Sequence, residues 1–499
     1  MGLLDGLISL IPEVSKPMEK KLSFKKKLYW TLAILIGFFI LGTLPLYGVG
    51  EDRLAQFETL SIIIGASFGS LMTLGIGPIV TASIVLSLLQ GSGIINFDTS
   101  TEVGKKRYHG ISRLLGLGFV LFEAIVYVKL GALAPATVID GIAMNFGAQK
   151  VIESLLILQL IIGGFVVLLM DDVINKWGFG SGISLFIVAG VAQQLVMRIF
   201  NPFNDTGSWA LGLDIVNWQA TGFFWSSIST AMSANWQGFF LAFLPILSTV
   251  LVFSICVFVQ SMKIEIPLQI ARYGGFSYRH PLNFLYTSNI PVIFIAALLA
   301  NVQLLSTVMN NWVNSGSEFI SQNIIGQSIG WFTNNVIGQI GAGSSIAGTG
   351  ISGWATAPNV LNSVITQKTL LLGTDFYLWI LGYTILLVIG SMIFAMFWVQ
   401  TSGADAHSLS KSLFKSGLQI PGTRSDPRIL ERHLSRYIMP LTIMGGIAVG
   451  LLAAFADLMG AATSGTGILL AVMIIYKMYE DIAKEHMGDF NPAFKKMIA

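Results

Sequence analysis

Residues 65–69, Gly-Ala-Ser-Phe-Gly, have the G-x-S-x-G spacing that places a nucleophilic serine on a sharp turn in serine hydrolases. Such a serine needs a base within hydrogen-bonding distance, and it sits between a strand and a helix. Neither requirement fits this chain. Its five histidines lie between or after long apolar segments, on the side of the membrane opposite to the one predicted for Ser67. We interpret the motif as small residues that let two backbones pack closely.

Carboxylates inside apolar segments are the next candidates, because buried acids usually mark ion or proton pathways. Glu123 lies within one apolar segment, Asp171 and Asp172 lie at the inner end of the next, and Asp457 lies in an outer turn. The aspartate pair is most simply read as interfacial residues beside Lys176. Glu123 is either a hydrogen-bonding group within the packing or part of a path. The sequence has neither a row of intramembrane charges nor paired catalytic aspartates, so we expect neither a charge-coupled pump nor an enzyme.

Cofactor chemistry has little support. Cys256 is the single cysteine, so a disulfide framework and a cysteine metal site are both impossible. The loops contain no glycine-rich P-loop for a nucleotide. We therefore expect no cofactor, no metal and no hydrolysis of ATP by the chain itself.

The elements that hold these residues are long apolar segments. The chain has 499 residues, of which 54% are apolar and 11% are charged, and its mean hydropathy is +0.72. Soluble domains carry about 25% charged residues, so this composition indicates an integral membrane protein. A span needs ~20 mostly apolar residues to cross the hydrocarbon core. Ten segments meet this requirement: 28–47, 71–93, 113–134, 150–170, 179–200, 237–260, 288–308, 376–399, 437–456 and 461–480.

Basic residues set the predicted orientation. With the N-terminus inside, all but five of the 29 Lys and Arg residues fall on the cytoplasmic side, as the positive-inside rule requires. The exceptions are Arg53, Lys129, Lys150, Arg198 and Lys368. We expect an amphipathic, basic cytoplasmic segment over 1–27 and a cytoplasmic tail over 481–499. The long outer loops are 201–236 and 309–375, and the long, basic inner loops are 261–287 and 400–436.

Three apolar segments contain residues that weaken a helix. They are IIIGASFGSLMTLGIGPIV (62–80), KWGFGSGISLFIVAG (176–190) and SNIPVIF (288–294). The first and third fall in the second span of two five-span halves, 28–200 and 237–480, as an inverted repeat would place them. The residues between the breaks are bulky and apolar, which favours a constriction that excludes water. Ordinary helix packing remains the alternative for any one segment.

Longer stretches around these breaks resemble the SecY family, the channel subunit of the protein translocon. GSLMTLGIGPIVTASIVLSLLQ and LLMDDVINKWGFGSGISLFI are similar to its two signatures. ARYGG, LNFLYTSNIPVI and GTGILLAVMIIYKMYE are similar to its archaeal and eukaryotic branch. The resemblance runs from about residue 20 to the end. Ser87 stands where the first signature usually has Gln, Phe179 stands where the pore position is usually aliphatic, and the outer loops look long.

The resemblance implies an all-α membrane protein with ten transmembrane helices in two inverted five-span halves around a central hourglass pore. Its function would be to translocate unfolded secretory polypeptides and to release transmembrane segments sideways into lipid through a lateral gate. A secondary transporter of a neutral or amphiphilic solute is the alternative. It shares the broken helices, but it would need a polar site at the membrane midplane, which the sequence does not offer.

The resemblance also implies site residues. The pore ring would be Ile76, Val80, Phe179, Ile183, Ile293 and Leu470. A plug at about 52–69 would have its hinge and seat at Gly65, Ala66, Ser67, Gly69 and Ser70. The lateral gate, between spans two and three on one side and seven and eight on the other, would include Thr81, Asn289 and Phe294. Ribosome docking would use Arg272, Arg279, Arg424 and Arg428.

The implied partners follow from the same family. They are small single-span translocon subunits of the SecE/γ and β types, the ribosome with its nascent chain, the signal-recognition machinery indirectly, and membrane lipids. The implied location is the plasma membrane, with several spans and both termini in the cytoplasm.

Overall fold

The computed structural model describes residues 12–19, 22–49, 69–91, 94–95, 102–129, 133, 135, 138–139, 142–143, 146–204, 208–210, 218, 220–270, 277–285, 287, 290–314, 328, 330–338, 350–358, 360–367, 374–415, 418–419 and 426–490. Ten helices among these residues occupy the positions of the ten predicted spans. Seven are long and apolar enough to cross a membrane: α5 (Glu102–Lys129), α6 (Phe146–Trp177), α7 (Gly182–Phe200), α9 (Trp236–Ser261), α10 (Ile290–Asn314), α15 (Thr374–Thr401) and α17 (Pro427–Leu458). The other three are α2 (Phe24–Thr43), α4 (Gly77–Gly91) and α18 (Gly465–Phe490).

These three helices depart from a plain apolar span for local reasons. Helix α2 has three lysines in its first turn, and α18 carries Lys477, Glu480 and Asp481 from its middle onward. Helix α4 has only 15 residues because it begins at Gly77, six residues later than predicted. Gly75 has a positive φ of 50°, which interrupts a right-handed helix, and Pro78 suits the first turn of the helix that follows.

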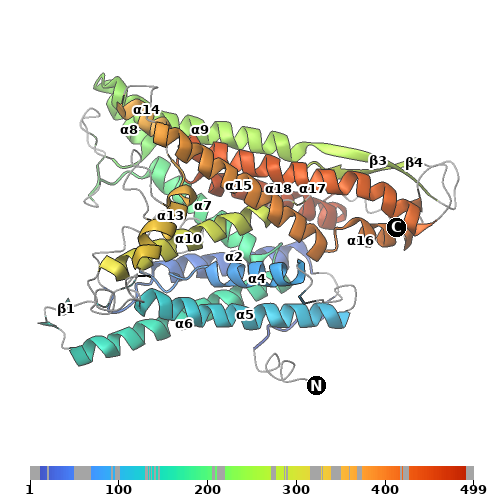
Figure 1. The fold of residues 1–499 in the computed structure, drawn as a ribbon, viewed down its shortest axis with the longest axis horizontal. Helices are drawn as coiled ribbons and strands as arrows, with labels where there is room; N and C mark the ends of the chain where they lie inside the picture. Colours follow the sequence, from blue (N-terminus) through green and yellow to red (C-terminus); the bar gives the residue numbers. More distant parts are fainter. Residues whose placement is uncertain are drawn as a thin grey trace.

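The helices form two groups that meet along the middle of the molecule. Helices α2, α4, α5 and α6 lie on one side, α9, α15, α17 and α18 lie on the other, and α7 and α10 lie between them (Figure 1). The largest buried apolar cluster draws residues from both groups, among them Val80 of α4, Phe186 of α7 and Leu470 of α18. Large apolar side chains on the outer faces are exposed, such as Ile36 and Phe258. A lipid bilayer would cover them.

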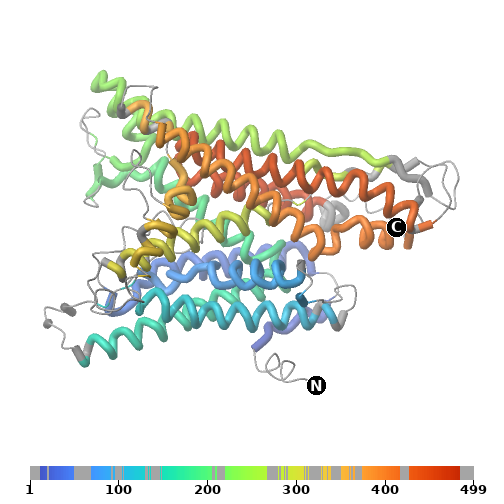
Figure 2. The backbone as a smooth tube through the Cα atoms, in the orientation of Figure 1, coloured from blue at the N-terminus to red at the C-terminus, as the bar shows by residue number. Residues whose placement is uncertain are grey.

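Shorter elements gather at the two ends of the bundle. Helices α8 (Phe223–Met232), α13 (Gly350–Ala355) and α14 (Val360–Gln367) and the strand β1 (Val138–Ile139) lie at one end, while α16 (Ala406–Lys415) and the strands β3 (Lys263–Ile270) and β4 (Ser277–Asn283) lie at the other (Figures 1 and 2). Strand β1 pairs with β2 (Ile142–Ala143), and Thr333–Ile337 form a single π-helical turn. Which end of the bundle faces the cytoplasm stays a prediction.

A small antiparallel sheet joins the two basic inner loops. Its strand order is β4-β3-β5, with β5 at Leu418–Gln419. In register, Gln269 lies opposite Gln419 and Ile270 lies opposite Leu418. The predicted loops 261–287 and 400–436, far apart in the sequence, therefore meet in one element, which the prediction of an all-α protein did not include.

Candidate functional site

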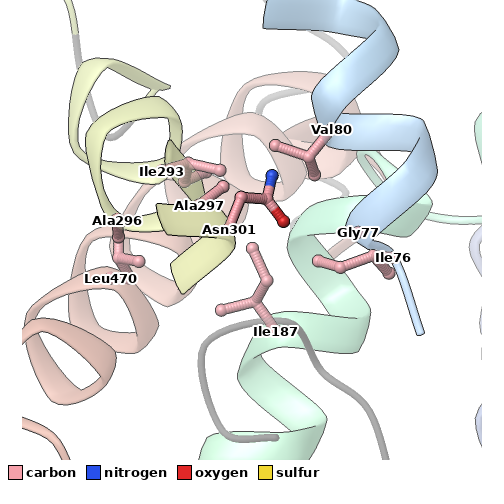
Figure 3. Close-up of a pocket in the computed structure, with 9 residues that line it drawn as sticks. All are labelled: Ile76, Gly77, Val80, Ile187, Ile293, Ala296, Ala297, Asn301 and Leu470. Atoms are coloured by element: carbon pink, nitrogen blue, oxygen red, sulfur yellow. The ribbon is translucent and has the colours of Figure 1, made fainter. Parts of the chain in front are cut away.

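A small cavity lies where α4, α7, α10 and α18 meet (Figure 3). Its volume is about 10 Å³, close to the least that one water molecule needs. Its lining comes from α4 and the turn before it, and from α7, α10 and α18. The lining residues are Ile76, Gly77, Val80, Ile187, Ile293, Ala296, Ala297, Asn301 and Leu470.

Four residues of the predicted pore ring line this cavity. They are Ile76, Val80, Ile293 and Leu470, and each is at most 7% exposed. Asn301 is the one lining residue, among those that the structure describes, with a polar side chain. A constriction of branched apolar side chains offers ions no replacement for their hydration shell, so it can hold back ions and water.

The two ring residues predicted from span five do not line the cavity. Helix α7 begins only at Gly182, because residues 178–181 form a turn in which Gly180 has a φ of 70°. Phe179 therefore precedes the helix, and its ring packs 5.2 Å from Phe24 at the start of α2. Ile183 lies in the first turn of α7, half-buried beside the apolar cluster. Both residues therefore lie at the N-terminal end of α7, before the residue that lines the cavity. Their assignment to the ring stays a prediction.

Ile187, and not Ile183, is the residue of α7 that lines the cavity. It is four residues further along, so it lies on the same face of the helix, one turn on. The sequence contained a signal for this shift, because three glycines over 178–182 disfavour a helix there. The role of Asn301 carried no such signal, since a single asparagine in an apolar span does not reveal its partner.

Polar contacts cross the seam between α4 and α10 and also link α4 to α5. Asn301 of α10 donates a hydrogen bond from Nδ2 to Thr81 Oγ1 of α4, at 3.1 Å. The same Thr81 oxygen lies 3.5 Å from Glu123 Oε1 of α5, and Glu123 is buried. One threonine of the predicted gate thus links α5, α4 and α10.

Phe294, the other described gate residue, faces a different helix. Its ring lies 5.8 Å from the ring of Phe394 and 6.2 Å from that of Trp398, both on α15. The partner of Thr81 on α10 is Asn301, seven residues and about 10 Å of helix beyond Phe294. The assignment of Phe294 to the lateral gate stays a prediction. Asn289 lies outside the described residues.

The predicted plug lies almost wholly outside the described residues, and so do Gly65, Ala66 and Ser67 of its hinge. Gly69 and Ser70 are described at its end. The amide of Leu46 donates to the Gly69 carbonyl at 2.8 Å, and the amide of Leu71 donates to the Leu44 carbonyl at 3.0 Å. These bonds join residues 44–46, which precede the predicted plug, to residues 69–71 in a short antiparallel bridge.

The predicted docking arginines belong to the two loops that the sequence predicts on the inner side. Arg279 of β4 and Arg428 of α17 are both exposed, and Arg279 pairs with Glu265 at 3.0 Å. Arg272 and Arg424 lie outside the described residues. Strand β3 ends at Ile270, two residues before Arg272, and β5 ends at Gln419, five residues before Arg424, and these two strands are paired in the sheet.

Comparison with known proteins identifies the family. The family model SecY matches residues 70–479. A curated relative from Methanococcus vannielii, named protein translocase subunit SecY, is 36% identical over 494 residues and covers 99% of this chain and 98% of its own length.

Solved structures match over almost the whole chain. One described as the structure of a protein conducting channel has a TM-score of 0.75 and 32% identity, covering 99% of each chain. Another has a TM-score of 0.74 and 32% identity at the same coverage. Its description states that the plug domain of the SecY protein stabilises the closed state of the translocation channel and maintains a membrane seal. Sec61 from a canine ribosome-channel complex of the endoplasmic reticulum has a TM-score of 0.72 and 31% identity, again covering 99% of each chain. This chain, a membrane protein with several spans, belongs to the SecY family.

Proposed function

We propose that this chain is the channel subunit of a protein translocon, which conducts unfolded polypeptides across the membrane and releases apolar segments sideways into lipid. The observation that carries the proposal is the small apolar cavity at the meeting of α4, α7, α10 and α18 in a chain of the SecY family. The name of the curated relative and the description of the first solved structure support it. A solute transporter has less support, because the cavity has room for about one water and a single polar side chain in its described lining.

The ring would act through contacts that need no particular partner. Dispersion contacts between apolar side chains and a passing chain depend on fit, so a ring of Ile, Val and Leu can close around any sequence. The same ring would hinder ions, because entry requires them to lose water. We assign the plug at about 52–69 as a second seal on the outer side, which the solved SecY plug structure supports.

The lateral gate would lie between α4 and α5 on one side and α10 and α15 on the other. The contact of Thr81 with Asn301 joins the two sides in the closed arrangement. Once the seam opens, partition into lipid can decide the fate of a segment. Leu at the centre of a helix favours lipid by about 0.5 kcal/mol, and Arg opposes it by about 3 kcal/mol.

The basic inner loops would dock a ribosome, whose RNA phosphates attract clustered arginines. The pairing of β3 with β5, which precede Arg272 and Arg424 in the sequence, supports a shared docking surface that would include Arg272, Arg279, Arg424 and Arg428. The canine ribosome-channel complex supports the same partner. We further propose small single-span subunits of the SecE/γ and β types as partners, and a plasma-membrane location with both termini in the cytoplasm.

Photo-crosslinking to a stalled nascent chain tests the proposal. A photoreactive amino acid at Ile187 or Leu470 of the reconstituted channel should crosslink to a polypeptide arrested during translocation. The matched control is Phe258, an exposed residue on the outer face of α9 that would contact lipid. Equal crosslinking from all three positions, or crosslinking from Phe258 alone, would refute a central polypeptide path.

A further inference from the structure

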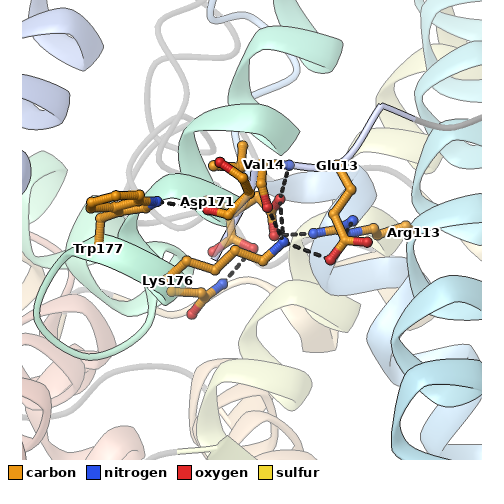
Figure 4. Close-up of polar contacts among 9 residues, drawn as sticks. Glu13, Val14, Arg113, Asp171, Lys176 and Trp177 are labelled. Carbon is orange, nitrogen blue, oxygen red and sulfur yellow. Dashed lines mark hydrogen bonds and ion pairs between the residues drawn. The ribbon is translucent and has the colours of Figure 1, made fainter. Parts of the chain in front are cut away.

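Two adjacent aspartates at the inner end of α6 contact different neighbours (Figure 4). Asp172, 8% exposed, forms an ion pair with Arg113 of α5 and another, at 3.2 Å, with Lys176 one turn along its own helix. Its Oδ2 also accepts a hydrogen bond from the amide of Val14 at 3.0 Å. Asp172 therefore ties α5 and the N-terminal segment to α6.

Asp171 contacts the start of α7. Its Oδ1 accepts a hydrogen bond from the amide of Ile183 at 3.0 Å, and its Oδ2 accepts one from Asn175 at 3.0 Å. Ser181, the residue before the helix, makes no side-chain cap of its own, so the carboxylate from α6 supplies it. The first amides of a helix lack partners within the helix, and an anion there is favourable.

The approach of α6 to α7 at this point is close. A Cβ added to Gly182 would lie 2.7 Å from the Cα of Asp171, so a larger residue would push the two helices apart. Ile183 and Ile187 lie on one face of α7, and Ile187 lines the cavity. The bond from Asp171 thus fixes the position of the helix that carries a pore residue.

A short N-terminal segment, residues 13–15, covers this place. Glu13 pairs with Lys176 at 2.6 Å and lies 3.8 Å from Arg113. Lys176 also donates to the Val14 carbonyl at 2.6 Å, and the indole of Trp177 donates to the Ser15 carbonyl at 2.9 Å. The segment therefore contacts Arg113 in the middle of α5 and the C-terminal end of α6 together.

We infer that Asp171 and Asp172 together couple the gate helix α5 to the pore helix α7. We call this pair of aspartates the joint, and residues 13–15 bind to it and to its neighbours Lys176 and Trp177. Helix α5 carries Glu123 at the seam, and α7 carries Ile187 at the cavity. The joint holds both helices in the closed arrangement, so breaking it favours opening of seam and pore together. Arg113, Asp171 and Asp172 are positioning residues, since they touch neither the cavity nor the seam. This inference rests on the proposed function.

The experiment compares the two ends of the same helix pair. Asp172→Asn and Arg113→Gln weaken the inner ion pair between α5 and α6. Lys129→Gln is the matched control, because Lys129 of α5 pairs with Glu153 of α6 at the opposite end. The readouts are ion leak through the idle reconstituted channel and the least apolar signal segment that still enters lipid.

We expect both inner variants to leak at least tenfold more than the parent, a shift of about 1.4 kcal/mol toward the open state, and to accept less apolar signals. The control should match the parent in both readouts. Inner variants that behave like the control, or that lose translocation without added leak, would overturn the inference. A parent that fails to translocate would instead refute the proposed function.

Folding is separated from coupling by a second variant. Glu13→Gln changes a side chain that is 61% exposed, so it leaves the packing of α5, α6 and α7 in place. It loosens the N-terminal segment from Lys176 and Arg113, and we expect a leak between those of the parent and Asp172→Asn. Thermal unfolding identifies any variant that is simply unstable. A stable Glu13→Gln variant with parental leak would remove residues 13–15 from the joint.

Discussion

Replacing Ile187 with aspartate tests which residue of α7 contributes to the constriction. The structure places Ile187 at the cavity, whereas the sequence predicts Ile183, one helical turn earlier. Ile187 is 2% exposed and lines a cavity of about 10 Å³. Removing a buried isoleucine side chain costs about 2–5 kcal/mol, and an unpaired carboxylate left in an apolar site adds a larger penalty. The closed state bears these costs, whereas an open, hydrated pore solvates the carboxylate. We expect the hydrated population to rise at least 100-fold, which corresponds to about 2.8 kcal/mol.

The assay is ion leak from proteoliposomes that contain the idle channel. Ile187→Val is the first control, since it costs only about 0.5–1.5 kcal/mol and adds no charge. Ile183→Asp is the second, because Ile183 lies one turn from the cavity and is already half-buried. We expect leak to rank Ile187→Asp first, Ile183→Asp next and Ile187→Val last. An Ile187→Asp channel no leakier than Ile187→Val would show that this side chain is ordinary packing, and a leakier Ile183→Asp would restore the ring predicted from the sequence.

Three further measurements test the seam, the docking surface and the N-terminal segment. With the single native cysteine replaced by serine, Thr81→Cys and Asn301→Cys should form a disulfide, because the native side chains touch and a disulfide needs Cα atoms within about 7 Å. The oxidised channel should neither insert membrane segments nor translocate secretory chains until it is reduced. Normal insertion by the oxidised channel would place the lateral exit between other helices. Arg272→Glu with Arg424→Glu should weaken ribosome binding and flatten its dependence on salt, since fewer counterions are released; parental affinity and slope would leave these arginines as topology signals. The hydrogen bond from Lys176 lowers the pKa of Glu13 below its ordinary value of 4.5. The contribution of Glu13 to holding residues 13–15 is therefore fully present above pH 4.5 and is lost as the pH falls through the lower pKa of the folded state. A spin label on residues 13–15 should gain mobility over that pH range, and the same gain in the Glu13→Gln variant would assign the transition to another group.

The spans and most of the ring could be predicted because they depend on local properties. Apolar length identifies a span, and the Gly and Pro residues around Ile76 and Val80 mark a broken one. The residue of α7 that lines the cavity was harder to predict, since it depends on where a glycine-rich turn ends and the helix begins. That boundary moved the lining position from Ile183 to Ile187.

Contacts between distant residues could not be predicted from local pattern. Thr81 and Asn301 are 220 residues apart, and Val14 and Asp172 are 158 apart. Single polar residues in apolar or basic surroundings do not specify their partners, so Asp172 was read as an interfacial residue beside Lys176 alone. The sheet of the inner loops was missed for a similar reason, because β3 contains a proline and β5 has only two residues.

The sheet that joins the inner loops also has a consequence for the order of folding. Gln269 and Gln419 pair across 150 residues, and β5 ends about four-fifths of the way along the chain. Parts of a chain made first fold first during synthesis, whereas contacts between distant residues must wait for the later partner. The hairpin of β3 and β4 can form early, but its third strand exists only after α15 and α16 have been made. A newly synthesised copy therefore completes this surface late, and a chain truncated before residue 418 should lack it even if its first eight spans are in place.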